Sequence, residues 1–273
     1  MAKYGMNLDL TAQKESTMRI APFLLITCLG YGCAAKKMTA QHADVLLEHQ
    51  IEKRLPLYSA QKEQLSKDVN KFLNAQKSFV KEAIPIITSI ELDPKKVDDQ
   101  YKKINALYNK LVTNFSAIIS KYMTPLDEKQ QKDFQKILEA ENQALKSSKS
   151  NDRMEKLNER FEIMFGSISS KQRKLLKEHG PYLEERHKVR MDRREQLQDR
   201  FKDIFKMDLS KDAKQNYFNK AFTDYQENYP ETSKNIEIIK DIIPTLSIEQ
   251  KEVFEDKIND LKDILNYYLE STY

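Results

Sequence analysis

Apolar residues recur every three or four positions along most of this chain, which is the spacing of one face of an α-helix. The most regular stripe runs from Val97 to Tyr122, and Thr124-Pro125 ends it. Shorter stripes with the same spacing cover 65–83, 134–145, 154–165 and 253–269. The pattern therefore predicts a succession of amphipathic helices, each with one apolar face and one solvated face.

A short phrase precedes several of these stripes and marks where a helix begins. It is Leu-Ser-Ile-Glu-Gln at 246–250, Ile-Ser-Ser-Lys-Gln at 168–172 and Leu-Asp-Glu-Lys-Gln at 126–130, with weaker copies at 57–61 and 209–213. The Ser or Asp caps free backbone N–H groups, and the Gln three residues later accepts a hydrogen bond from the N–H of the cap residue. The gaps between the copies are unequal, which argues against a regular solenoid.

Proline, glycine and polar residues separate the predicted helices by short connections, which makes neighbouring helices antiparallel. The breaks fall at Pro56, Pro85, Thr124-Pro125, 147–151, Gly166, Gly180-Pro181, Pro230 and Pro244. We therefore expect an all-α protein, an elongated antiparallel helical bundle of about seven to nine helices, with residues 41–273 as a single domain. If this domain consists of two sub-bundles, they divide near 147–151.

Composition supports this fold class and limits the function. The chain has 273 residues, five Gly and no Trp, and 32% of its residues are charged. A β-rich chain of this length would need Gly at many turns. The net charge of +4 is a small excess for a protein that neutralises many phosphates, so binding of nucleic acid is disfavoured.

The start of the chain has the features of an export signal. An apolar run from Ile20 to Leu29 follows Arg19 and is too short to span a membrane. It is followed by Gly32-Cys33, and small residues before a Cys at this place resemble a bacterial lipoprotein signal, in which the Cys becomes the acylated first residue. The alternatives are a plain secretory signal and an uncleaved anchor.

This interpretation predicts a signal peptide at 1–32, with an extension before Met18, and a lipidated tether at 33–40 attached through Cys33. Ala34 follows the Cys, which in lipoproteins of the usual Gram-negative type suggests sorting to the outer membrane. The protein would then face the periplasm. Cleavage at Cys33 leaves no second Cys, so no disulfide is expected in the mature chain.

Two family resemblances follow from these features. The phrase at 246–250 is similar to the Leu-Thr-x-x-Gln motif of Spy-type periplasmic chaperones, with Ser or Asp here in place of Thr. The order of lipobox, capped second helix and Arg-rich middle helix resembles an uncharacterised family of all-helical Gram-negative lipoproteins over most of 33–273. The resemblances imply an all-helical fold in the envelope, and the first implies binding of polypeptides.

The sequence shows no motif for catalysis or metal binding. It lacks a Gly-x-Ser-x-Gly elbow, a phosphate-binding Gly loop and His-Glu-x-x-His. Glu184 and His187 have the spacing found in di-iron bundles, but such sites need two of these pairs, and this one stands among Arg residues. His42 and His49 lack a carboxylate at ligand spacing. We therefore expect no enzymatic activity, no metal and no cofactor.

One stretch breaks the hydrophobic pattern and is the candidate site. Between Leu183 and Leu197, the face that should be apolar carries Arg190 and Arg194, flanked by Arg186 and His187. The stretch either is solvated, pairs with buried carboxylates such as Asp44 and Glu48, or lines an open groove. In the groove, Arg side chains would hold an anionic group or an acidic segment of a partner.

Two functions fit these observations. The first is a periplasm-facing lipoprotein that acts as a binding or chaperone-like module for envelope polypeptides. The second is a structural envelope lipoprotein that docks one dedicated partner. Both involve the membrane through the lipid anchor and an envelope protein as partner, and neither requires catalysis.

Overall fold

The computed structural model describes residue 38, residues 40–227 and residues 233–273, and the predicted signal peptide and Cys33 lie outside these ranges. Ten α-helices and a short 3₁₀ helix, and no strand, occur in the described ranges, which confirms the all-α prediction. They are α3 (Ala43–Glu52), α4 (Ser59–Thr88), α5 (Val97–Met123), α6 (Glu128–Lys146), α7 (Ser150–Phe165), α8 (Ser170–Glu178), α9 (Gly180–Lys206), α10 (Lys211–Glu227), α11 (Ser233–Ile242), η2 (Ile243–Thr245) and α12 (Ile248–Glu270).

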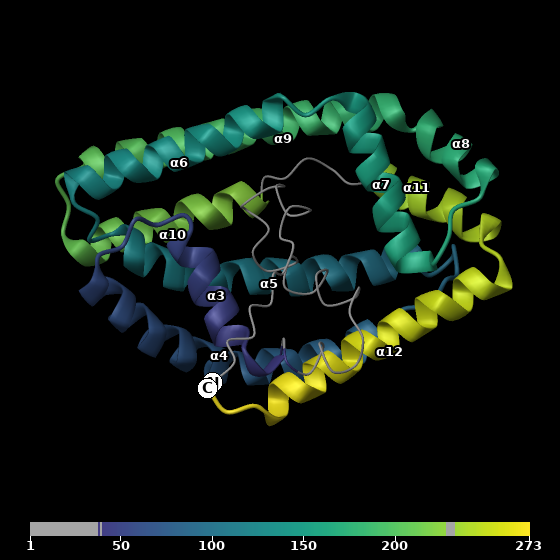
Figure 1. Ribbon diagram of the computed structural model, residues 1–273, viewed down its shortest axis with the longest axis horizontal. Helices are drawn as coiled ribbons and strands as arrows, with labels where there is room; N and C mark the ends of the chain where they lie inside the picture. Colours follow the sequence, from purple (N-terminus) through teal and green to yellow (C-terminus); the bar gives the residue numbers. More distant parts are fainter. Residues whose placement is uncertain (1–37, 39, 228–232) are drawn as a thin grey trace, which may run out of the picture.

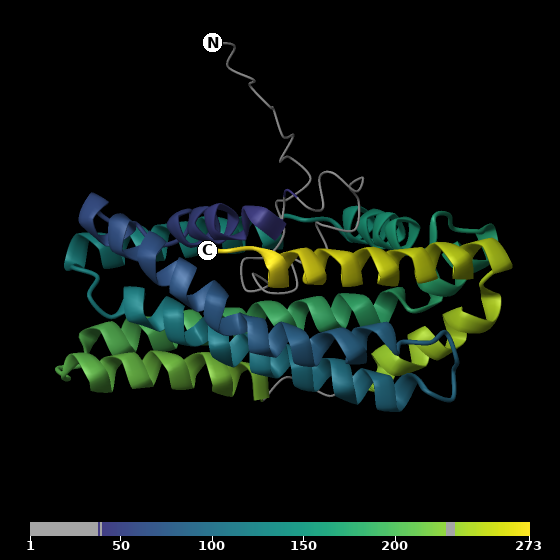
Figure 2. The same ribbon diagram turned by 90° about the horizontal axis from the view of Figure 1, so that it is seen from below.

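The long helices run lengthwise through an elongated molecule, and neighbours are antiparallel (Figure 1). Helix α5 packs against α10 and α4, α10 packs against α9, and α9 packs against α6. Helix α12 packs against α4 and α7. In Figure 1, α6 and α9 form the upper edge, α4 and α12 lie along the lower edge, and α7, α8 and α11 lie at the right-hand end. Seen from below, the same helices lie in layers along the long axis (Figure 2).

The apolar core is distributed over several clusters. The largest joins α3, α4, α5, α6, α9 and α10, and its most buried side chains are Leu47, Leu65, Val69 and Phe218. A second cluster joins the C-terminal half of α4 to α5 and α12, and a third lies among α7, α8, α11 and the start of α12. Burial of one large apolar side chain contributes about 1.5–3 kcal/mol, so the first cluster dominates stability.

Most predicted breaks coincide with helix ends. Helix α6 ends at Lys146 and α7 begins at Ser150, as the polar turn predicted. Gly166 ends α7 with φ of +77°, the left-handed conformation that favours Gly. Pro181 occupies the first turn of α9, where its missing N–H costs nothing. Pro85 does not end α4, which continues to Thr88, because Pro85 lies in the last turn.

The recurring phrase begins helices as predicted, and the copies also pair with one another. The first junction joins the start of α4, at Tyr58–Gln61, to the start of α6, at Asp127–Gln130. The Gln130 amide donates to Gln61 Oε1 at 2.6 Å and to the Pro56 carbonyl at 2.7 Å. The Tyr58 hydroxyl donates to Asp127 Oδ2 at 2.9 Å. This junction lies at the left-hand end of Figure 1.

The second junction joins the start of α8, at Ser169–Gln172, to the start of α12, at Ser247–Gln250. Gln172 Nε2 donates to Gln250 Oε1 at 2.8 Å, and Gln250 Nε2 donates to Gln172 Oε1 at 3.1 Å. Each amide also donates to a carbonyl two residues before the partner's cap, Thr245 and Ser167 respectively. This exchange is reciprocal, and it lies at the right-hand end of Figure 1.

Two tyrosines hold the C-terminal segment, one against α4 and one against the beginning of the described chain. The Tyr268 hydroxyl donates to the Leu73 carbonyl at 2.5 Å, and the Tyr273 hydroxyl donates to the Ala40 carbonyl. Burial raises the pKa of Tyr273 to about 12. The C-terminal residues therefore lie beside Ala40, the last residue of the predicted tether.

Candidate functional site

The four candidate residues on α9 have different partners among the described residues. Arg186 donates to Asn235 Oδ1 on α11. Arg190 Nη2 donates to Nδ1 of His187, one turn away on the same helix, at 3.2 Å. Arg194 points to α6 instead. The candidate lipid-attachment residue, Cys33, lies outside the described residues.

Arg194 is the buried member of the set, with a side chain that is 3% exposed. Its Nη2 donates to Glu141 Oε2 at 2.7 Å, and its Nε donates to Asn142 Oδ1 at 2.5 Å. Asn142 and Gln198 exchange hydrogen bonds beside it. The sequence suggested Asp44 and Glu48 on α3 as partners, whereas this carboxylate comes from α6, because α9 packs along α6 at this level.

Beside Arg194 lies a cavity of about 120 Å³, called here the interhelical pocket. It is bounded by α3, α5, α6, α9 and α10 and by Arg54 and Leu55, which lie shortly after the end of α3. Its lining is mostly apolar, with Val112, Ile119, Met123, Leu138, Phe201 and Phe222 among the side chains. Several lining residues, including Gln50 and Tyr108, are only half-buried, so the pocket reaches the surface.

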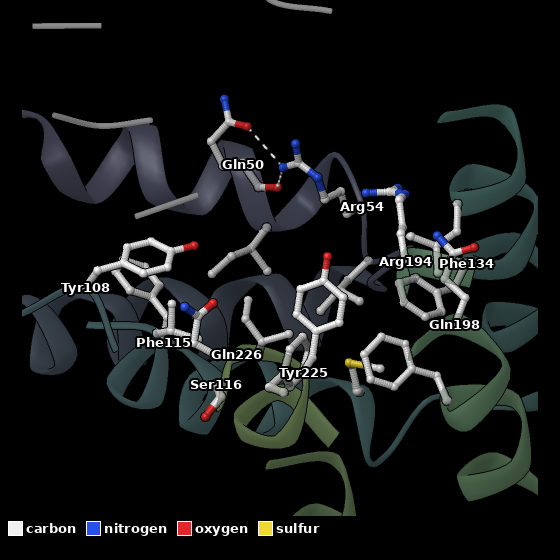
Figure 3. Close-up of a pocket in the computed structure, with 18 residues that line it drawn as sticks. Gln50, Arg54, Tyr108, Phe115, Ser116, Phe134, Arg194, Gln198, Tyr225 and Gln226 are labelled. Carbon is white, nitrogen blue, oxygen red and sulfur yellow. Dashed lines mark hydrogen bonds between the residues drawn. The ribbon is translucent and has the colours of Figure 1, made fainter. Parts of the chain in front are cut away.

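The two charged side chains of the pocket lie on one side, whereas its other polar groups are distributed around the lining. Figure 3 shows Arg54 and Arg194 along this side, with the ring of Tyr225 standing in the pocket and its hydroxyl directed toward Arg54. Arg54 Nη1 donates to the Gln50 carbonyl at 2.8 Å and to Gln50 Oε1 at 3.1 Å. No carboxylate lines the pocket among the described residues. Glu141 lies behind the two arginines, 3.6 Å from Arg54 Nε.

This arrangement perturbs Arg54. Burial lowers the pKa of its guanidinium, the Glu141 carboxylate raises it, and the neighbouring Arg194 lowers it again. An arginine stays charged even with such a shift, so the pocket holds a permanent positive charge next to apolar walls. An apolar cavity with a few convergent polar groups is the usual form of a ligand site.

Other titratable groups are used within the fold. Glu184 accepts hydrogen bonds from Arg153 and Ser150, and Arg153 lowers its pKa. Glu184 is therefore engaged in an ion pair with α7. His179 Nε2 lies 3.5 Å from Asp241 Oδ2. Within the described ranges, no group of His, Cys, Asp and Glu has the geometry to hold a metal ion.

Comparison with protein-family models, with curated proteins and with solved structures finds no match for this chain. Across the part of the chain that the structure describes, no helix combines the length and apolarity needed to cross a membrane.

Sequence reasoning pointed to Arg194 and missed the pocket. Arg194 is recognisable because it interrupts an apolar face. Arg54 gives no comparable signal, since it follows the last turn of a short helix, where a basic residue is ordinary. The remaining lining residues look like core side chains in sequence, and only the packing of five helices leaves space between them.

Proposed function

We propose that this protein is a non-catalytic binding protein of the bacterial cell envelope that holds an apolar group of a partner polypeptide in the interhelical pocket. The observation that carries the proposal is the pocket itself, an apolar cavity between five helices with two arginines on one side. The likeness of the helix-start phrases to the Spy-type motif supports a polypeptide as the partner.

The proposed location is the periplasmic face of the outer membrane, with Cys33 as the lipid attachment. The apolar run before Gly32-Cys33 and the Ala34 that follows support it. Replacing Cys33→Ser should release the protein from membranes or leave its signal uncleaved. Incorporation of labelled fatty acid that is equal with and without Cys33 would contradict the assignment.

Suppression of aggregation tests the binding function. The protein, mixed with an unrelated unfolding client, should protect it at near-stoichiometric amounts. Val112→Phe, which fills the pocket, should remove the protection. Thr113→Phe is the matched control, because Thr113 is the next residue on α5 and is exposed.

Two results would count against the proposal. If the Val112→Phe variant still protects the client, the client binds outside the pocket. Absence of protection by the wild-type protein, together with one polypeptide that co-purifies from the envelope, would favour the alternative of a structural lipoprotein that docks a dedicated partner.

A further inference from the structure

Arg54 is held in the pocket wall with unused hydrogen-bonding capacity. Its side chain is 15% exposed. Its Nη1 is bonded to Gln50, while its buried Nε has no hydrogen-bond partner among the described residues. The nearest carboxylate oxygen, Glu141 Oε1, is 3.6 Å from that Nε and is beyond hydrogen-bond distance. That Nε is inaccessible to solvent, so the donor left for an incoming acceptor is Nη2, which makes no hydrogen bond among the described residues.

Glu141 is bonded to Arg194 and pairs with Arg54 only through the longer contact to Nε. Arg194 Nη2 donates to Glu141 Oε2 at 2.7 Å, and Asn142 fixes the Arg194 guanidinium from a second direction. Arg194 and Glu141 thus form a supporting pair, and Arg54 is the arginine left to face an incoming group. A hydrogen bond from a guanidinium to a carboxylate is charge-assisted and is stronger than a bond between neutral groups.

The size of the pocket limits what accompanies the carboxylate. An apolar cavity of about 150 Å³ in a protein core holds one benzene molecule. The interhelical pocket, at about 120 Å³, is slightly smaller. Its apolar part therefore accommodates one side chain about as large as Leu and is too small for a long acyl chain.

From these observations we propose that the pocket takes the carboxyl-terminal residue of a polypeptide, with the α-carboxylate on Arg54 and a Leu-sized side chain among Val112, Ile119 and Phe222. This inference rests on the proposed function and names the part of the polypeptide that is bound. The charged side of the pocket and its apolar walls then each contact one half of the same terminal residue.

Binding of short peptides tests the inference on the wild-type protein without any substitution. The probes are acetyl-Gly-Ser-Ala-Leu with a free carboxylate, the same peptide as its carboxyl-terminal amide, and isocaproate, a small acid with the same isobutyl end. We expect calorimetry to give the free-acid peptide at least about tenfold higher affinity than the amide, the effect of one charge-assisted contact.

Two substitutions should change that ratio in opposite directions. Arg54→Gln removes the positive charge and should reduce the preference for the free acid to less than about twofold. Glu141→Gln removes the competing negative charge and should increase the preference. Arg200→Gln is the matched control, because Arg200 pairs with Asp224 outside the pocket and is exposed. Circular dichroism checks that each variant is folded.

The outcomes separate this inference from the proposed function. Equal affinity for the free acid and the amide overturns the carboxylate inference, while Val112-dependent protection of a client keeps the proposed function. Failure of both peptides to bind likewise overturns the carboxylate inference, while Val112-dependent protection of a client again keeps the proposed function. Isocaproate binding as tightly as the peptide overturns the polypeptide source and makes the pocket a site for small acids. If Arg54→Gln does not fold, the wild-type comparison of acid with amide decides alone.

Discussion

The two helix-start junctions are built from the same phrase, and their differences show what the phrase needs in order to be structural. In the second junction, Gln172 and Gln250 are 0% and 5% exposed, and each is held by a Ser cap. In the first junction, Gln130 is 2% exposed, but Gln61 is half-buried and its cap position is Tyr58. The first junction compensates with a hydrogen bond between Tyr58 and Asp127.

The difference has an energetic consequence. Buried amides must be hydrogen-bonded, so the bonds that Gln172 and Gln250 exchange cannot be replaced by water when one partner is removed. In the first junction, water can replace part of what Gln61 provides. The second junction should therefore be the more sensitive to substitution.

Replacing Gln172→Ala should give the largest effect, a loss of about 3 kcal/mol in the free energy of unfolding, because it leaves the buried Gln250 amide without its partner. Gln61→Ala should cost about 1 kcal/mol, since its site is reached by solvent. Urea unfolding measures both. Gln143→Ala, on the exposed face of α6, is the control and should change stability by less than about 0.5 kcal/mol. Equal losses at Gln172 and Gln61 would remove the proposed distinction.

Replacing Gly166→Ala should destabilise the protein by about 1–2 kcal/mol, because the residue has φ of +77°. The added Cβ would also lie 3.2 Å from Val253 Cγ2 of α12, close to the second junction. Gly180→Ala is the matched control, since nothing lies within 4 Å of its Cβ position and its φ is unstrained. That substitution should be neutral or stabilising. Similar melting temperatures for the two variants would contradict this account.

Replacing Ser247→Ala or Ser169→Ala should cost about 1 kcal/mol each, the usual effect of a lost N-cap. Their Oγ atoms accept from the N–H groups of Gln250 and Gln172 at 3.2 Å. Ser59→Ala is the comparison within the first junction, because Ser59 is exposed and follows the cap position. Denaturant unfolding should show almost no change in the free energy of unfolding for Ser59→Ala. A loss as large as that of Ser247→Ala would mean that the cap positions are wrongly assigned.

Acid should weaken the first junction through its titrating cap. The backbone N–H of Gln130 and the Tyr58 hydroxyl hold the pKa of Asp127 below its ordinary value. A carboxylate with a lowered folded-state pKa stabilises above its unfolded pKa, and this contribution is lost as the pH falls through the folded pKa. Protection of the Gln130 amide against hydrogen exchange should therefore decrease in acid.

The second junction provides the contrast in that measurement. The Ser247 hydroxyl oxygen, which accepts from the Gln250 amide, does not titrate. Protection at Gln250 should persist to lower pH than protection at Gln130. Asp127→Ser should make the two amides behave alike, and an unchanged pH profile in that variant would exclude Asp127 as the cause.

Local signals in the sequence were enough to place most helices. The capped starts at Asp127, Ser169 and Ser247 and the breaks at Gly166 and 147–149 all fall where residue type predicts them. These features depend on hydrogen bonds and backbone angles within a few residues, so the sequence contains the information directly. The same reasoning explains why the all-α class was predictable from periodicity alone.

The pairing of Gln61 with Gln130, and of Gln172 with Gln250, was decided by tertiary structure. These partners lie 69 and 78 residues apart in the chain. Arg194 shows the same limit, because its place on the apolar face was visible in the sequence, while its burial and its partner Glu141, 53 residues away, were not. The pocket beside Arg54 depends on how five helices fail to fill the space between them. Helix ends follow from local chemistry, whereas these long-range contacts depend on which solvated and apolar faces the folded chain brings together.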